Sequence, residues 1–358
     1  MAMHSLDLAH WLLRNSGPCI RYRVLVDLLD EQDVGLVGQA LRDMLASPEV
    51  LTWLERLQPA FGINDLHSGN PAAYENVMGK LVQLGLRAGL RDFDVRTLPF
   101  RTWLSESVKV PSERPHSEFL RTIVASFLAY AGYGQTGAVA QQMLQRLESL
   151  HKFARRPDFG NIFVDKADYS GIPNYGEAHR LVNPDLYCDQ QFMLPWIHDI
   201  RGIASTPMIM DNQRLKRKAD NIVAMILSQE YQEIPFNYGL GKYGPRYYVI
   251  GWAVKLPGFD SRPEGREFAE MLLNLEMLAR FPSANKSRWF KNAMDYLGEF
   301  ETSLGTYSFP RGWLSEKKVG YWVGGLHMMF DRRTGRRSAI ECESTFRVSR
   351  IKQLAGLL

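Results

Sequence analysis

The chain has 358 residues, of which 45% are hydrophobic and 23% charged. This composition is typical of a globular protein with a large core and excludes wholesale disorder. The formal net charge of +4 is too small over this length to indicate a nucleic-acid-binding protein. The three cysteines, Cys19, Cys188 and Cys342, are far apart in the sequence, which excludes a disulfide framework and a paired-cysteine metal motif.

Apolar residues recur at helical spacing in most of the chain, which predicts an all-α fold. The expected helices, in chain order, cover 6–14, 20–29, 37–54, 73–86, 118–130, 138–153, 187–203, 212–228, 247–256, 265–281, 289–304 and 338–357. Loops rich in glycine, proline and aromatic residues are expected at 58–71, 157–184, 232–245 and 307–325.

Helices that alternate with short and long connections predict about six helical hairpins that close into an α/α toroid, with the long loops at one mouth. An open solenoid of helical hairpins has the same pattern and remains an alternative. No low-complexity linker divides the chain, so we expect a single domain over residues 1–358.

The sequence contains neither a membrane-spanning run nor an export signal. No segment reaches 18 uninterrupted apolar residues, and the start MAMHSLDLAHWLLRNSG lacks a basic region followed by a long apolar run. We therefore expect no membrane span and a cytoplasmic location, which the few cysteines also favour.

The richest polar cluster is NYGEAHRLVNPDLYCDQ, residues 174–190. Histidine, tyrosine and carboxylate side chains together can be tuned for proton transfer near neutral pH. The residues expected to be catalytic are His179, Tyr187, Asp189 and Tyr175, and those expected to bind substrate are Asn174 and Arg180. A structural alternative is a helix start capped by Asn183 or Asp185, beside a solvated pair of Glu177 and Arg180.

A second candidate is NYGLGKYGPRYYVIGW, residues 237–252, in which tyrosines alternate with glycines. Tyr238 and Tyr247 could offer aromatic faces to a substrate, while Arg246 and Lys242 could meet a carboxylate or phosphate. The alternative is an aromatic loop packed between two helices.

The third candidate is FPRGWLSEKKVGYWVGGLHM, residues 309–328, which has neither helical nor strand periodicity. We expect Trp322 and Lys318 to bind substrate and His327 to take part in catalysis, facing the same cavity as His179 and Tyr187. Alternatively, the aromatic residues plug one end of a barrel and His327 is a core histidine.

Several phrases resemble bacterial proteins of the terpenoid cyclase and protein prenyltransferase group of α/α toroids. They are WLLRNSGPCIRYRVLVDLL, YENVMGKLVQLGLRAGLRDFD, FPRGWLSEKKVGYWVGG and ECESTFRVSRI. The resemblance implies a toroid with a site at one mouth. The acid motif DxDD of the cyclases is incomplete in Asp92–Val95, DFDV, and the zinc ligands of the prenyltransferases could correspond only loosely to Asp185, Cys188 and His327.

These patterns together favour an enzyme that uses no cofactor or metal and acts by acid–base chemistry on an apolar or partly apolar small molecule. Lyase, isomerase and cyclase reactions are the expected types. A uronate lyase or glycosidase on the same fold is an alternative, because Asn, His, Tyr and Arg serve that chemistry as well. A noncatalytic binding or scaffold protein is the third hypothesis.

Overall fold

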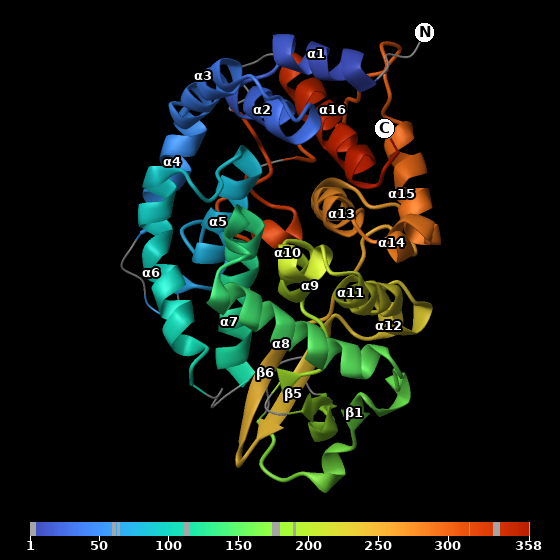
Figure 1. The fold of residues 1–358 in the computed structure, drawn as a ribbon. Helices are drawn as coiled ribbons and strands as arrows, with labels where there is room; N and C mark the ends of the chain where they lie inside the picture. Colours follow the sequence, from blue (N-terminus) through green and yellow to red (C-terminus); the bar gives the residue numbers. More distant parts are fainter. Residues whose placement is uncertain are drawn as a thin grey trace. The chain divides into compact units, whose positions relative to one another are not determined.

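The computed structural model describes residues 5–58, 62, 65–110, 115–173, 180–188, 191–314, 316–331 and 337–357. The protein is mainly helical, with 60% of its residues in helices and 7% in strands, which confirms the helical class and adds a small sheet. Internal contacts divide the chain into two compact units (Figure 1). Unit 1 comprises Met1–Thr97 and Pro257–Leu358, and unit 2 comprises Leu98–Leu256.

Unit 1 is built from helices taken from both ends of the chain. They are α1 (Ser5–Asn15), α2 (Pro18–Arg23), α3 (Val34–Leu45), α4 (Pro48–Arg56), α5 (Tyr74–Leu84), α13 (Gly265–Leu278), α14 (Pro282–Lys286), α15 (Arg288–Gly298) and α16 (Arg337–Leu354). Helix α6 (Arg91–Ser107) begins in unit 1 and ends in unit 2. Side-chain caps fix several starts: Asp33 accepts from two backbone N–H groups of α3, and Ser47 accepts from one of α4.

Helix α5 is the most enclosed element of unit 1, since each of its residues is buried. It contacts α4 and the helical turn Trp322–Gly324, and it ends at Gly85, whose φ of 119° suits glycine. Four of its buried side chains are polar: Glu75, Asn76, Lys80 and Gln83. Buried polar groups require partners, so the neighbours of α5 must supply donors and acceptors.

Unit 2 combines a helical layer with a small sheet. Its helices are α7 (Pro115–Leu128), α8 (Gly137–Ala154), α9 (Ile197–Ala204), α10 (Pro207–Met210), α11 (Gln213–Ile226) and α12 (Gln229–Glu233). Helix α7 packs against α8 and α9 (Figure 1). The sheet has the order β1 (Phe163–Val164), β2 (Leu181–Val182), β5 (Asn237–Tyr243), β6 (Arg246–Trp252), and a separate pair consists of β3 (Tyr187–Cys188) and β4 (Gln191–Phe192).

A buried ion triad connects α7, α8 and α9 in unit 2. Arg146 donates to Asp199 Oδ1 over 2.7 Å and also to Glu118, and all three side chains are fully buried. Burial raises the pKa of Glu118 to about 7, although the positive charge of Arg146 and the hydrogen bond from the Phe192 N–H group both act to lower this pKa. One buried cation between two carboxyl groups therefore links the three helices, and its removal would leave both carboxyl groups buried without it.

The helix predicted for 247–256 is wrong, because Arg246–Trp252 forms strand β6, antiparallel to β5. The apolar run is short and rich in aromatic and β-branched residues, which suit a strand. Gly244 and Pro245 form a two-residue turn between the paired residues Tyr243 and Arg246, and Gly244 has a φ of 57°. Glycine at the first turn position is a hairpin signal. The loop predicted for 232–245 therefore contains β5.

Other elements also differ from the expected ones, among them the helix predicted for 37–54, which consists of two helices, α3 and α4. The helix predicted for 187–203 starts only at Ile197, because β3, β4 and Pro195 precede it, and a residue before proline is disfavoured in helical conformation. Helix α6 was not predicted, and it contains Pro99 in its interior, a residue that normally indicates a helix end. None of the helices in the described residues is long and apolar enough to cross a membrane.

The triad gives the first prediction. The substitution Arg146→Met leaves two buried carboxyl groups without their cation. We therefore expect the free energy of unfolding, measured by urea denaturation, to be about 3–5 kcal/mol lower than that of the wild type. Lys218→Met is the matched control, because Lys218 pairs with the half-exposed Glu148 and such pairs contribute about 0–1 kcal/mol. An Arg146→Met protein as stable as the control would contradict the assigned role.

Candidate functional site

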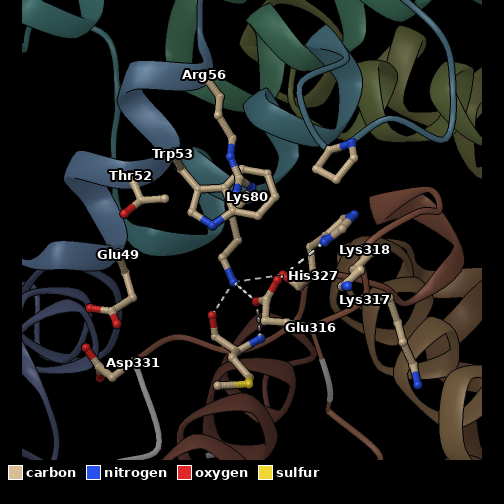
Figure 2. Close-up of a pocket in the computed structure, with 12 residues that line it drawn as sticks. Glu49, Thr52, Trp53, Arg56, Lys80, Glu316, Lys317, Lys318, His327 and Asp331 are labelled. Carbon is tan, nitrogen blue, oxygen red and sulfur yellow. Dashed lines mark hydrogen bonds and ion pairs between the residues drawn. The ribbon is translucent and has the colours of Figure 1, made fainter.

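Unit 1 contains a cleft of about 450 Å³, formed by α4, α5 and the segment 316–331 (Figure 2). Helix α4 lines it with Glu49, Thr52, Trp53 and Arg56. The pairs 49/52 and 53/56 are three residues apart and the pairs 49/53 and 52/56 are four apart, so these side chains share one helix face. Pro71 and Lys80 line it from the segment before α5 and from α5 itself. The segment 316–331 contributes Glu316, Lys317, Lys318, His327, Met329 and Asp331.

Lys80 holds the floor of the cleft together. Its side chain is 1% exposed, and its Nζ lies 2.5 Å from Glu316 Oε1. The same Nζ donates to the carbonyl oxygen of His327 over 2.9 Å and to that of Met329. An ammonium group has three donors, so the three acceptors of the segment 316–329 use all of them, as the dashed lines in Figure 2 show.

Glu316 joins Lys80 to His327. Its second carboxylate oxygen lies 3.3 Å from His327 Nδ1, and His327 Nε2 lies 3.3 Å from the Gly320 carbonyl oxygen. Burial alone would raise the pKa of Glu316, but the charge of Lys80 and the hydrogen bonds from His327 and Lys80 lower it to about 2. Glu316 is therefore a fixed negative charge at neutral pH.

His327 occupies an unusual backbone position. Its φ is 59°, a region in which residues other than glycine are uncommon and which is enriched at functional sites. The ring is buried and meets Trp53 edge-on at 5.2 Å between ring centroids. Both ring nitrogens face acceptors, and a neutral ring can donate to only one of them. His327 thus lies in the cleft wall between the Glu316 carboxylate and the Gly320 carbonyl oxygen.

Asp331 is the carboxyl group in the cleft that is best suited to exchange a proton. Burial, together with the negative charges of Glu49 and Glu343, raises its pKa to about 6, although hydrogen bonds from Cys19 act in the other direction. Its Oδ1 atom is buried and has no hydrogen-bond partner among the described residues. A pKa near the working pH is what a general acid or base requires.

The cleft also contains cations that could hold an anion. Lys317 and Lys318 are exposed, and within the described part of the chain neither makes an ion pair. Arg56 lies over the Trp53 ring at 4.3 Å from its centroid, which places a guanidinium group on an aromatic surface. The arrangement suits a partly apolar ligand with a negative group.

Three of the predicted residues belong to unit 1, and two of them line the cleft. These are His327 and Lys318. Trp322 is instead completely buried against α5, where its N–H groups donate to Asn76 Oδ1 over 2.8 Å and to Gln83 Oε1 over 2.9 Å. Its environment is that of a core residue, and a substrate-binding role stays a prediction.

Five of the predicted residues that belong to unit 2 are described. The Tyr187 hydroxyl is buried without a partner among the described residues, and burial raises its pKa well above the ordinary value. Tyr238 is a core residue, whose hydroxyl donates to Pro195 O over 2.9 Å. Tyr247 donates to Ser170 O, whereas Arg180 and Arg246 are exposed.

The remaining predicted residues, Asn174, Tyr175, His179 and Asp189, lie outside the described residues. The expectation that Trp322 and His327 share a cavity with His179 and Tyr187 therefore stays a prediction. In the described ranges, no three His, Cys, Asp or Glu side chains are placed to hold a metal ion. Asp185 and Cys188 belong to unit 2 and His327 to unit 1.

Comparisons with protein families, with curated proteins and with solved structures gave no match for this chain. The resemblance to terpenoid cyclases and prenyltransferases thus rests on the sequence phrases alone.

Sequence reasoning missed Glu49, Trp53, Lys80, Glu316 and Asp331. Two local signals point to three of them, Glu49, Trp53 and Lys80. The lysine at position 80 is the one charged residue in the largely apolar helical pattern VMGKLVQLGL, and a charge in such a pattern indicates either a buried partner or a site. The residues 49, 52 and 53 lie within the helix predicted for 37–54 and share one of its faces.

Lys80→Met tests the role of the buried ammonium group. It leaves two carbonyl oxygens and Glu316 without their donor, so we expect a loss of about 2–4 kcal/mol in the free energy of unfolding. We also expect faster amide hydrogen exchange in the peptide 316–329, measured by mass spectrometry. Lys318→Met replaces an exposed lysine of the same segment and is the control. It should change the free energy of unfolding by no more than about 0.5 kcal/mol and leave the exchange of the peptide 316–329 unchanged. Unchanged exchange in Lys80→Met would contradict the anchoring role.

Asp331→Asn should show a pH-dependent gain in stability relative to the wild type. The native carboxyl group keeps its proton up to about pH 6, whereas the unfolded chain loses it near 3.8, so wild-type stability falls as pH rises between these values. Asparagine does not titrate. We expect the free-energy difference between variant and wild type to increase by about 1–2 kcal/mol from about pH 4 to about pH 7, measured by urea unfolding. The same difference at both pH values would refute the raised pKa.

Proposed function

We propose that the cleft in unit 1 is the active site of a cofactor-independent acid–base enzyme, of lyase or isomerase type, that acts on a small, partly apolar organic anion. The observation that carries this proposal is Asp331, a half-buried carboxyl group in a cleft, whose buried Oδ1 atom has no partner among the described residues. Its pKa of about 6 also favours a catalytic site over a noncatalytic scaffold.

Each part of the cleft has a role in this proposal. Lys317 and Lys318 attract the negative group of the substrate, and the Trp53 ring offers an apolar surface. Asp331 transfers the proton. Lys80 is a positioning residue, because it acts through Glu316 and the backbone of the segment 316–329. The catalytic roles predicted for His179, Tyr187, Asp189 and Tyr175 stay predictions and are not part of this proposal.

The α/α toroid, the likeness to the terpenoid cyclase group and a cytoplasmic location are further parts of this proposal. The mainly helical chain supports the first two, and the two free, buried cysteines Cys19 and Cys342 agree with the third.

Glycoside chemistry is a second candidate, and one observation favours it. Glu49 and Asp331 face each other on one side of the cleft (Figure 2), and most glycosidases cleave their substrate with two carboxyl groups, one as acid and one as base or nucleophile. Release of reducing ends or unsaturated uronides from oligosaccharides would favour this candidate over the first.

Solvent deuterium incorporation tests the proposed chemistry before the substrate is known. The wild-type protein is incubated in D₂O with pooled hydroxy, keto and unsaturated carboxylic acids, and carbon-bound deuterium is detected by mass spectrometry. A proton-transfer enzyme should label at least one acid. Asp331→Asn should label the same acid at least about 100-fold more slowly than the wild type, because a positioned acid or base contributes about 10²–10⁴-fold to the rate.

Asp43→Asn is the matched control for this assay, since Asp43 lies outside the cleft, in the neighbouring cavity. It should label the same acid at the wild-type rate. Equal rates for the wild type and Asp331→Asn would contradict the proposed role of Asp331, and no labelling by the wild type would contradict the acid–base function on these acids.

A further inference from the structure

Arg56 is a half-buried cation of the cleft whose N–H groups the described protein does not use. It is the last residue of α4 and lines the cleft, and no described residue accepts a hydrogen bond from it or forms an ion pair with it. The residues of unit 1 outside the described ranges include no aspartate or glutamate. The guanidinium group is therefore not neutralised by an acidic side chain of its own unit.

Trp53 fixes the plane of this guanidinium group. The guanidinium carbon lies 4.3 Å from the centroid of the Trp53 ring, and the ring itself is buried. A guanidinium group that stacks on an aromatic face keeps N–H groups along its edge, where they can donate in pairs to two oxygens of one anion. Arg96, which donates to Leu57 O over 3.2 Å, already serves the carbonyl group that follows α4. Arg56 is thus a preorganised donor for an anion in the cleft.

The cleft keeps an excess of positive charge when its internal ion pair, Lys80 and Glu316, is set aside. The other charged side chains of its described lining are three cations and two acids, namely Arg56, Lys317, Lys318, Glu49 and Asp331. A carboxylate offers one charge and two oxygens to three cations. A phosphate monoester carries a charge of about −1.5 to −2 at pH 7 and offers three acceptor oxygens, so it matches the cations better.

Helix α4 separates the anion end of the cleft from Asp331. Glu49 precedes Arg56 by seven residues, which corresponds to about 10 Å along the helix axis, and Asp331 lies close enough to Glu49 for its pKa to be raised by that charge. Figure 2 shows Arg56 at one end of α4, with Glu49 and Asp331 at the other. An anion at Arg56 therefore avoids the acidic side chains and directs the rest of the ligand toward Asp331.

We infer that the substrate is a phosphate monoester of a small, partly apolar molecule, with its phosphate group bound by Arg56, Lys317 and Lys318 and its reacting carbon near Asp331. The phosphate group keeps all its bonds and serves only to bind and orient the substrate. The inference rests on the proposed function for the site and its chemistry. It adds the class of substrate and makes Arg56 the residue that selects it.

The test compares phosphate monoesters with carboxylates of similar shape. Phenyl phosphate is paired with benzoate, and butyl phosphate with pentanoate, and dissociation constants are measured by calorimetry. The proteins are the wild type, Arg56→Met, Arg56→Lys and the control Arg14→Met. Arg14 is an exposed residue of α1 that does not line the cleft, so its substitution removes the same charge from the same unit.

The wild type should bind at least one phosphate monoester about tenfold tighter than its matched carboxylate, and inorganic phosphate should compete with that monoester. Arg56→Met should bind the monoester about 10–100-fold more weakly, because paired, charge-assisted hydrogen bonds are lost. Arg56→Lys keeps the charge without the paired donors, so its affinity should lie between these two. Arg14→Met should bind like the wild type.

Urea denaturation of the same proteins separates binding from a structural role. If Arg56 only packs on Trp53, Arg56→Met lowers the free energy of unfolding but keeps the wild-type ratio of phosphate to carboxylate affinity. That outcome would remove Arg56 from the inference. The conservative variant Arg56→Lys provides a folded protein for the comparison if Arg56→Met is unstable.

Two further results would overturn the inference. Equal affinity of the wild type for monoesters and carboxylates rules out the phosphate class but leaves the anion cleft and the proposed function intact. No binding of any probe also overturns it, and the deuterium assay then decides the proposed function separately.

Discussion

The buried ammonium group of Lys80 is the constraint on which the candidate site depends. An unpaired charge is too costly in the core of unit 1, so Lys80 must gather acceptors, and the described ones all come from the segment 316–329. That segment has little regular secondary structure, and nothing in its local sequence would fix its path. Because three of its acceptors meet at one nitrogen, its backbone is held where it forms the cleft floor.

The rest of α5 extends the same contact. Asn76, Lys80 and Gln83 follow one another at spacings of four and three and so share a helix face; Gln83 donates to Met328 O over 2.6 Å, and Asn76 accepts from the Trp322 N–H group. Gly79 lies beneath the Trp322 ring, where a Cβ atom would come within 2.4 Å of the indole. The polar face of α5 and the aromatic, glycine-bearing segment 309–328 therefore fit each other, which explains a stretch that has no periodicity of its own.

Local sequence patterns predicted those helices whose positions depend on local apolar periodicity. The helical period located α5, α8, α11 and α13, because each buries one or more faces that the sequence marks with apolar residues. The period failed for β6, where the short aromatic run is ambiguous and the turn at Gly244 carried the decisive signal. In the site, the segment 309–328 led to His327 and Lys318, but Lys80 pairs with a residue 236 positions away. Such a pairing depends on the folded path of the chain and leaves no spacing to detect.

Glu316 and Asp331 show how Lys80 influences the chemistry of the cleft. Glu316 lies beside Lys80 and has a pKa lowered to about 2, whereas Asp331 lies beside Glu49 and has one raised to about 6. Groups of the same chemical type are thus driven apart by their neighbours, a pattern that separates fixed charges from proton carriers in active sites. Because Lys80 and Glu316 largely neutralise each other, the electric field that a ligand meets comes from the other charged residues of the cleft, Glu49, Arg56, Lys317, Lys318 and Asp331. Lys80 therefore fixes the path of the segment 316–329 and also determines which carboxyl group of the cleft is a fixed charge.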